Sequence, residues 1–245
     1  MKKYPLYDII LKLEGDIRMS NGITKSALCA EFLGSMFLVM SAISPILLFA
    51  YVFETSMGVA LFANAISVAF VLCALIEIFG PISSAHFNPV VTMVMLLEKK
   101  IRPARAALFI LFQIAGGIAG TLASHLMFFE QIGSLMSIAQ KTREGYMFPS
   151  EIFATFILVL AILLLVKAQS GKSSIIIGLL VGGQIIATSS MMFANPQVTI
   201  ARMFTDSSAG IRPIDGLIFI AMQIIGALLA YAVYRFIFAK VKTHH

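Results

Sequence analysis

The chain has 245 residues, of which 59% are hydrophobic and 12% are charged. Soluble domains carry roughly a quarter charged residues, so this composition excludes an ordinary soluble fold and indicates a polytopic membrane protein. The formal net charge of +6 fits basic loops on one side of a membrane and does not require a nucleic-acid partner.

Residues 1–26 are mixed and charged, whereas residues 27–239 are dominated by apolar runs. We expect an N-terminal segment, a single membrane domain over 27–239 and a short tail over 240–245. No cleavable signal is apparent in the N-terminal segment, which predicts either an interfacial helix or a partly ordered tail. Cys29 and Cys73 both fall in apolar segments, so neither a disulfide nor a metal site follows from them.

Six apolar runs are long enough to cross a bilayer, which takes roughly 20 residues each. They cover residues 27–52, 58–80, 104–128, 150–168, 173–192 and 214–239. Two further runs, 88–97 and 195–204, are too short to cross and are expected to form helices that reach halfway through the membrane.

Lysine and arginine gather on one side of this topology. That side holds residues 1–26, the connections at 99–105 and 167–172, and the end of the chain from Arg235 onward. The positive-inside rule therefore predicts that both termini face the cytoplasm. The first short run then enters the membrane from the cytoplasmic side and the second enters from the opposite side.

Three sequence features occur in both halves in the same order: Glu-x-Phe, Asn-Pro-x-Val-Thr, and a glutamine in the third span. The matched strings are AEFLGSMFLV (30–39) with SEIFATFILV (150–159), HFNPVVTM (86–93) with FANPQVTI (193–200), and FQIAGG (112–117) with MQIIGA (222–227). This order predicts an inverted repeat, with repeat one at about 27–128 and repeat two at about 150–239. The expected fold is an all-α membrane protein with six transmembrane helices and two re-entrant half-helices.

Each Asn-Pro pair predicts the start of a helix. Proline fits the first helical turn, where its missing N–H deprives no acceptor, and asparagine before it is a favoured N-cap. Because the two runs enter from opposite sides, Asn88 and Asn195 are expected to meet near the bilayer midplane. The backbone of 83–87 and 189–194 would then border a narrow water path, since non-helical backbone at that depth must be buried or line a cavity.

Asparagine amides at such a meeting point can donate hydrogen bonds to a passing oxygen. Two positive helix ends would at the same time disfavour cations and protons. The pattern therefore predicts a path for neutral molecules such as water or a polyol. Two ordinary capped helix starts without a pore are the alternative interpretation, and the inverted pairing favours the path.

These motifs resemble the aquaporin and glycerol-facilitator superfamily, the major intrinsic proteins, over nearly all of residues 27–239. The resemblance implies that Asn88 and Asn195 are the paired motif asparagines of a passive channel. It further implies that Glu31 and Glu151 accept hydrogen bonds from the re-entrant loops, and that the chain forms a homotetramer with one pore per subunit. We expect His86 to support the first loop in the same way.

The second motif departs from the family pattern, which has arginine three residues after the asparagine. Val198 stands there instead, which removes five hydrogen-bond donors and a fixed positive charge. By resemblance, the other constriction positions are Val68, Met192 and either Gly183 or Ile185. This ring holds no charged and no aromatic side chain, so we expect it to admit bulky neutral solutes.

The segment VTIARMFTDSSAGIRP (198–213) narrows the resemblance to a bacterial branch that lacks the family arginine. That branch implies conduction of glycerol-like polyols, water and uncharged metalloid hydroxides such as arsenite, in a bacterial inner membrane. Met192 could be a soft contact for metalloids.

Arg202 lies one helical turn beyond Val198 on the same expected face. It either lines the outer vestibule as a displaced arginine or pairs with Asp206 or with loop carbonyls. Glu77 either lines the cytoplasmic vestibule or forms an internal hydrogen bond. His125 is expected to be an interfacial or core residue. Three small residues are expected to mediate helix packing: Gly116, Gly117 and Gly120.

Two other functions are compatible with parts of the pattern. A water-selective channel would share the fold. An ion-coupled secondary transporter would also use inverted repeats, with Glu31 and Glu151 as ion sites. An enzyme is not expected, because the sequence has no metal-ligand cluster, supported catalytic triad or phosphate loop; no cofactor is expected either.

Overall fold

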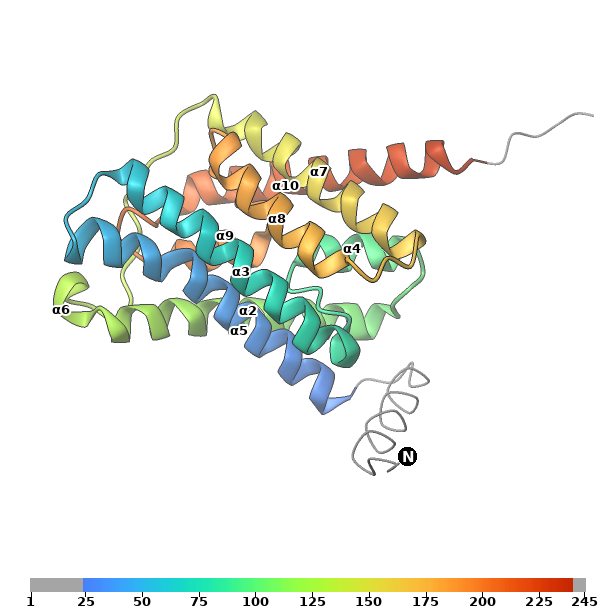
Figure 1. Cartoon of the computed structure of the whole chain (residues 1–245), viewed down its shortest axis with the longest axis horizontal. Coiled ribbons are helices and arrows are strands. Elements are labelled where there is room, and N and C mark those ends of the chain that lie inside the picture. The colour runs from blue at the N-terminus through green and yellow to red at the C-terminus, as the bar shows by residue number, and fades with distance from the viewer. Residues whose placement is uncertain (1–23, 240–245) are drawn as a thin grey trace, which may run out of the picture.

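The computed structural model describes residues 24–239 as helices joined by loops (Figure 1). The elements in chain order are α2 (Lys25–Leu47), the π-helix η1 (Leu48–Val52), α3 (Met57–Ser83), α4 (Pro89–Leu97), α5 (Pro103–Met127), α6 (Phe129–Ile132), α7 (Met147–Lys167), α8 (Ser173–Ala187), α9 (Pro196–Arg202) and α10 (Pro213–Ile237). The predictions for most of the N-terminal segment and for the tail fall outside the described residues.

The predicted all-α membrane architecture is confirmed. In the described part of the chain, five helices are long and apolar enough to cross a membrane: α2 with its η1 extension, α3, α5, α7 and α10. The sixth, α8, is shorter, and α4 and α9 are the half-helices. Figure 1 shows the short helices among the long ones, and α9 packs against α2, α5 and α10 while α4 packs against α5 and α10.

The predicted fifth span, 173–192, extends too far at its C-terminal end. The helix α8 has 15 residues and ends at Ala187, because Thr188 turns into an extended conformation (φ −107°, ψ 140°). The Thr188 hydroxyl donates to the Gln184 carbonyl at 2.6 Å and accepts from the Met192 amide at 3.0 Å. This hydroxyl redirects the chain into a loop, although the apolar residues beyond it make the run look longer.

Glycines set the closest helix contacts in both halves. A Cβ atom at Gly116 of α5 would lie 2.1 Å from the Phe32 carbonyl oxygen of α2, and one at Gly120 would lie 2.4 Å from that of Met36. In the second half, a Cβ at Gly226 of α10 would lie 2.5 Å from the Ile152 carbonyl of α7. Small residues allow membrane helices to approach this closely, so α2–α5 and α7–α10 form matching pairs.

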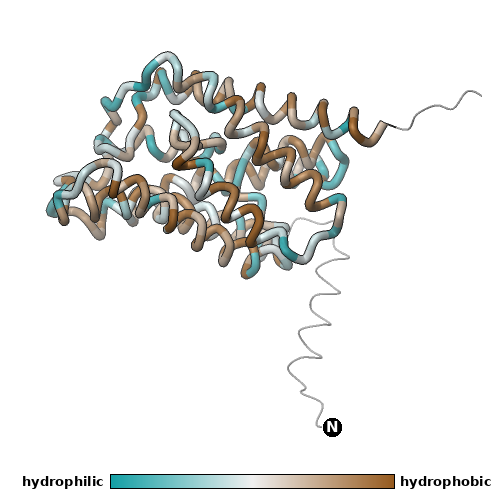
Figure 2. Tube along the Cα trace, turned by 45° about the horizontal axis from the view of Figure 1, so that its top comes forward, coloured by the Kyte–Doolittle hydropathy of each residue, from teal (hydrophilic) through white to brown (hydrophobic). Residues whose placement is uncertain are grey.

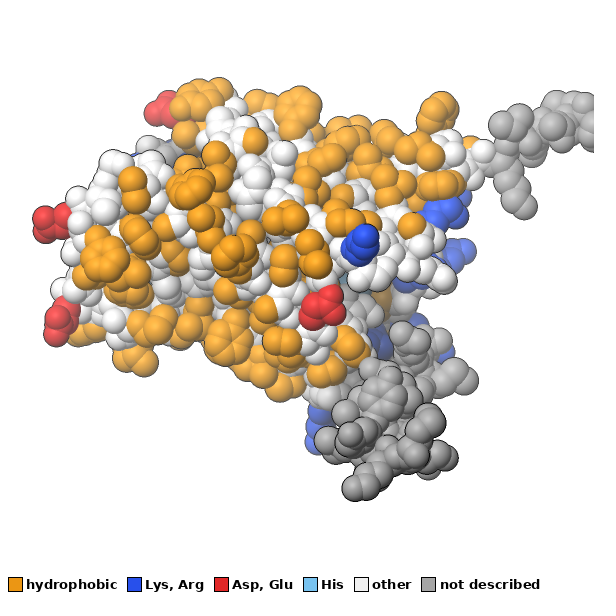
Figure 3. All heavy atoms as spheres, in the orientation of Figure 1, with side chains coloured by type: hydrophobic (Ala, Val, Ile, Leu, Met, Phe, Trp, Pro, Cys, Tyr) orange, Lys and Arg blue, Asp and Glu red, His pale blue; other side chains and the backbone are white. Residues whose placement is uncertain are grey.

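The exterior is apolar around the helices and charged at the ends. Exposed side chains such as Phe70 (67%) and Phe153 (71%) belong to this apolar surface, and the hydrophilic colour in Figure 2 gathers in the loops. The visible face in Figure 3 carries most of its blue side chains at one end. We call this the basic end; it carries Lys99, Lys100, Arg102, Lys167, Lys172 and Arg235. The opposite end, formed by residues 53–56, 128–146 (which include α6) and 203–212, is the far end.

Candidate functional site

The two Asn-Pro pairs start the two half-helices, as the sequence predicts. The Asn88 side-chain oxygen accepts from the Val90 amide at 3.1 Å, and the Asn195 oxygen accepts from the Gln197 amide at 3.1 Å. Both asparagines have extended backbones and a proline follows each at the first helical position. The asparagine oxygen therefore caps its own helix, which leaves the amide nitrogen free to face elsewhere.

These amide nitrogens reach across to the opposite loop. Asn88 Nδ2 donates to the Ala194 carbonyl at 2.9 Å, and Asn195 Nδ2 donates to the Phe87 carbonyl at 2.8 Å. A primary amide has two N–H donors, so each asparagine keeps one for a further acceptor. The exchange ties the starts of the two half-helices together at the centre of the molecule.

A buried carboxylate organises the first loop. Glu31, which is fully buried, accepts from the amides of His86 at 3.0 Å and Phe87 at 2.8 Å. Gln113 Nε2 of α5 donates both to Glu31 at 2.6 Å and to the Thr92 hydroxyl of α4 at 3.0 Å. Glu31 of α2 therefore holds the loop, and Gln113 of α5 holds the half-helix α4.

The second loop repeats this arrangement. Glu151, also fully buried, accepts from the amides of Phe193 at 3.0 Å and Ala194 at 2.8 Å. Gln223 Nε2 of α10 donates to Glu151 at 2.7 Å and to the Thr199 hydroxyl of α9 at 2.9 Å. The glutamate and glutamine that recur in each half thus act as a pair.

Both loops contain non-glycine residues with left-handed backbones. The φ angles are 48° at Ala85, 46° at Phe87, 41° at Met192 and 46° at Ala194. Such conformations are uncommon for residues with a Cβ and cost about 1–3 kcal/mol each. The hydrogen bonds to the buried glutamates offset this cost.

A cavity of about 440 Å³ runs between the two halves and includes Asn88 and Asn195 in its wall. Its apolar wall near the second half-helix contains Val68, Ile185, Met192 and Val198. Gly183 is not part of this wall; it is exposed on α8, and a Cβ there would meet nothing within 4 Å. Residues i and i+2 of an α-helix point in directions about 200° apart. Ile185, the other candidate, therefore faces the cavity when Gly183 faces outward.

Comparison with known proteins agrees with this geometry. The family model for major intrinsic proteins matches residues 19–194. The chain belongs to this family. Aquaglyceroporin AqpS of Rhizobium meliloti (strain 1021) is 35% identical over 85% of this chain and 88% of its own length. Aquaporin-1 of Bos taurus is 28% identical over 87% of this chain and 82% of its own length.

A solved structure supports the same fold for this major intrinsic protein. The X-ray structure of the aquaglyceroporin from Plasmodium falciparum superimposes with a TM-score of 0.61, covering 88% of this chain and 96% of the other. At 16% sequence identity this likeness concerns the fold alone. Family membership makes the chain an integral membrane protein of a channel family.

Two histidines and one glutamate were singled out by the sequence. His86 lines the cavity, with Nδ1 3.1 Å from the Thr92 hydroxyl and its ring edge-on to Phe109. His125 is buried and its Nε2 lies 2.7 Å from the Thr205 hydroxyl, so it joins α5 to the loop at the far end. Glu77 accepts a hydrogen bond from Ser174 and lies outside the cavity wall, which favours the internal-bond interpretation.

Arg202 lines the cavity beyond Val198 and is only 4% exposed. Its guanidinium donates to the Ala42 carbonyl of α2 and lies 4.4 Å from the centre of the Phe193 ring. It does not pair with Asp206, whose carboxylate accepts instead from the Gln140 amide. The residue is therefore both a cavity-lining side chain and a donor to a backbone carbonyl.

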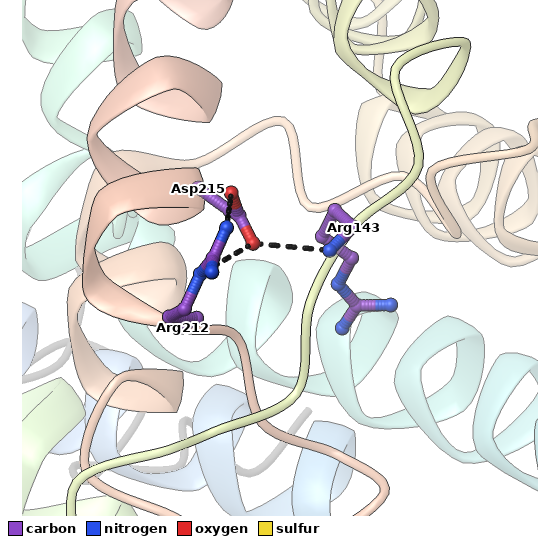
Figure 4. A network of polar contacts seen from close by, with 3 residues as sticks. All are labelled: Arg143, Arg212 and Asp215. Atoms are coloured by element: carbon purple, nitrogen blue, oxygen red, sulfur yellow. Dashed lines mark hydrogen bonds and ion pairs between the residues drawn. The ribbon is translucent and has the colours of Figure 1, made fainter.

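Arg143, which the sequence did not single out, approaches the same ring from the loop before α7. Figure 4 shows Asp215 facing the Arg143 backbone and the Arg212 side chain, while the Arg143 guanidinium extends away. That guanidinium donates to the Gly210 carbonyl at 2.6 Å and lies 5.2 Å from the Phe193 ring centre. Burial lowers the pKa of Arg143 to about 10, against the raising effect of Glu151 and Asp215, so it is charged at neutral pH.

Sequence reasoning also missed Gln197, which lies between Pro196 and Val198 in the second Asn-Pro motif. Its Nε2 lies 3.3 Å from the Phe87 carbonyl, which already accepts from Asn195. Its side chain occupies the space beside Gly117, where a Cβ would lie 2.2 Å from Gln197 Oε1. The missing side chain of Gly117 thus leaves room for the Gln197 side chain of α9. The missing side chain of Gly116 instead lets the backbone of α2 approach α5.

Proposed function

We propose that the chain is a passive channel of the aquaglyceroporin type. It conducts glycerol-like polyols, uncharged metalloid hydroxides such as arsenite, and water, and it excludes ions. The AqpS relative is named an aquaglyceroporin, and the cavity chemistry supports extending that class to this chain.

The observation that carries the proposal is the composition of the cavity wall beside the asparagine pair. Val68, Ile185, Met192 and Val198 form one apolar group on that wall, and Val198 stands at the position where the family pattern has an arginine. The asparagine amides next to them offer donors to an oxygen. A hydroxylated solute can place its carbon or metalloid centre on the apolar side chains and its oxygens on the amides, whereas an ion would lose its hydration shell without replacement.

The basic end defines the proposed orientation. Lysine and arginine concentrate in cytoplasmic loops, so we assign the basic end to the cytoplasm and the far end to the outside of a bacterial inner membrane. In this orientation α4 enters from the cytoplasm and α9 from outside. The exposed apolar faces would contact lipid and neighbouring subunits of a homotetramer.

The transporter alternative is disfavoured by the position of its proposed ion sites. Glu31 and Glu151 are fully buried, lie outside the cavity wall and have their oxygens occupied by loop amides. A carboxylate that binds a coupling ion must be exposed to the pathway. Solute flux through the protein should therefore be independent of pH and sodium gradients.

The decisive experiment is stopped-flow light scattering on proteoliposomes that contain the wild type, Val198→Arg or Val198→Leu. Each is offered an impermeant osmolyte, glycerol and neutral arsenite in turn. We expect the wild type to pass water, glycerol and arsenite, and Val198→Arg to reduce glycerol and arsenite flux about tenfold or more while sparing water. Val198→Leu separates added bulk from added charge.

A wild type that conducts only water would refute the proposed solute class and support a water-selective channel. Equal glycerol flux through wild type and Val198→Arg would remove Val198 from the selectivity region.

A further inference from the structure

Three residues lie one helical turn farther toward the far end than the apolar wall group. Asn64 precedes Val68 by four residues on α3, which runs from the far end toward the basic end. Arg202 follows Val198 by four residues on α9, which runs the other way. Four helical residues correspond to about 6 Å along the axis. With Ala42 of α2, these residues also line the cavity.

The Ala42 carbonyl is the point on which the two polar side chains converge. Asn64 Nδ2 donates to it at 2.9 Å and to the Ser41 carbonyl at 3.3 Å, and the Arg202 guanidinium donates to it from α9. These contacts link α2, α3 and α9 across one end of the cavity. Side chains from separate walls therefore meet on one acceptor.

A proline in α2 explains why backbone acceptors are available there. Pro45 lies inside the helix and has no N–H, so the Ser41 carbonyl lacks the donor that an α-helix would place four residues later. Asn64 supplies that donor from α3. Its side chain is 3% exposed, and the bond to α2 fixes it at the cavity wall.

The charge of Arg202 has no carboxylate partner at ion-pair distance. Across residues 24–239 the ion pairs are Arg212 with Asp215 and Arg235 with Glu98. Arg143 and Glu151 act on Arg202 from farther away with opposite signs. Its positive charge is therefore only partly compensated, and the carbonyl and the Phe193 ring hold it in place.

We propose that Arg202, Asn64 and the Ala42 carbonyl form a second, polar constriction that performs the ion exclusion which Val198 cannot. The constriction lies one turn outside the apolar wall group and separates two tasks. The apolar group selects by size, and the fixed guanidinium repels cations and protons. Arg202 has five donors and its Nε is buried, so the terminal N–H groups not used by Ala42 can bind the oxygens of a neutral hydroxylated solute as it enters.

The test compares Arg202→Met, which removes the charge at similar length, with Arg202→Lys, which keeps it. Proteoliposomes with internal pyranine receive a potassium diffusion potential, and the initial proton leak is measured. We expect Arg202→Met to raise the leak about tenfold, and Arg202→Lys to stay within about twofold of the wild type. The double variant Arg202→Met/Val198→Arg should return the proton leak to the wild-type level. It places a guanidinium in the cavity again, one helical turn closer to Asn195 than Arg202 is.

A second variant covers the case in which Arg202→Met does not fold. Asn64→Asp leaves Arg202 in place but sets a carboxylate beside it, so the leak should rise severalfold. A leak within twofold of the wild type in folded Arg202→Met, or in folded Asn64→Asp, would overturn the proposal. The leak assay needs no permeating solute, so its outcome is separate from the outcome of the glycerol and arsenite measurements.

Discussion

The two re-entrant loops are nearly identical in how they are held, but the half-helices after them differ. In each half a buried glutamate binds two loop amides, a glutamine joins that glutamate to the half-helix, and an asparagine reaches the other loop. The half-helix α4 continues with apolar residues to the basic end, whereas α9 carries Val198 and Arg202 toward the far end. The loop supports that both halves share hold the pathway in place. The half-helices, which differ, give the two ends of the pathway different side chains.

The largest expected effect concerns the symmetric glutamates. Glu31→Ala or Glu151→Ala leaves two buried loop amides without an acceptor, at about 1–3 kcal/mol for each group. Both variants should lose monodisperse protein on size exclusion in detergent and lose solute flux. Glu31 also accepts from the Ser83 hydroxyl at 2.6 Å, so its replacement should be at least as damaging as that of Glu151.

Glu77→Ala is the matched control for those variants. Glu77 is exposed and accepts a hydrogen bond from Ser174, so its removal should leave elution and flux close to wild type. A Glu151→Ala protein as stable as Glu77→Ala would contradict the supporting role.

An intermediate effect is expected at the glycine contacts that pair the long helices. Gly116→Ala and Gly226→Ala each place a methyl group against a carbonyl of the neighbouring helix, so each should destabilise the protein by about 1–3 kcal/mol. Thermal unfolding in detergent measures the loss. Gly183→Ala, where the new methyl meets nothing within 4 Å, should be neutral or slightly stabilising. Unequal losses at Gly116 and Gly226 would show where the halves diverge in packing.

The smallest effect should follow Gln197→Ala. This change removes a 3.3 Å bond to the Phe87 carbonyl, which still accepts from Asn195 at 2.8 Å. Glycerol flux should stay within about twofold of wild type, because the Phe87 carbonyl keeps the hydrogen bond from Asn195 and is not left unsatisfied. A loss of flux as large as that of Glu151→Ala would make Gln197 part of the essential support.

The repeated motifs allowed much of the fold to be predicted from the sequence. Apolar run length located the spans, and the Asn-Pro pairs located both half-helices. Hydropathy alone misplaced the end of α8, because the chain turns at a single hydroxyl, that of Thr188, with apolar residues beyond it. The choice between Gly183 and Ile185 needed the rotation of α8, which loop length does not determine from sequence.

Sequence reasoning singled out Arg202 of the polar constriction, but it did not find the partners of this arginine. Asn64 and Pro45 lie on separate helices, and neither belongs to a repeated motif. Their connection becomes visible only when the Ser41 and Ala42 carbonyls are seen to accept from α3. Arg143 belongs to a long loop whose position no periodic pattern predicts. The sequence signals that could have indicated this contact were Pro45, inside the first span, and Asn64, inside the second.

The left-handed loop residues and the short half-helices together bear on the order of assembly. Helices of nine and seven residues are too short to be stable alone, and unpaired loop backbone cannot rest in lipid. Neither re-entrant segment can therefore enter the bilayer core as an independent unit during synthesis. The pairs α2–α5 and α7–α10 must first bring Glu31 and Glu151 into position. Each half-helix packs against helices of both repeats, so it inserts late, into a protein-lined space that the two repeats form together.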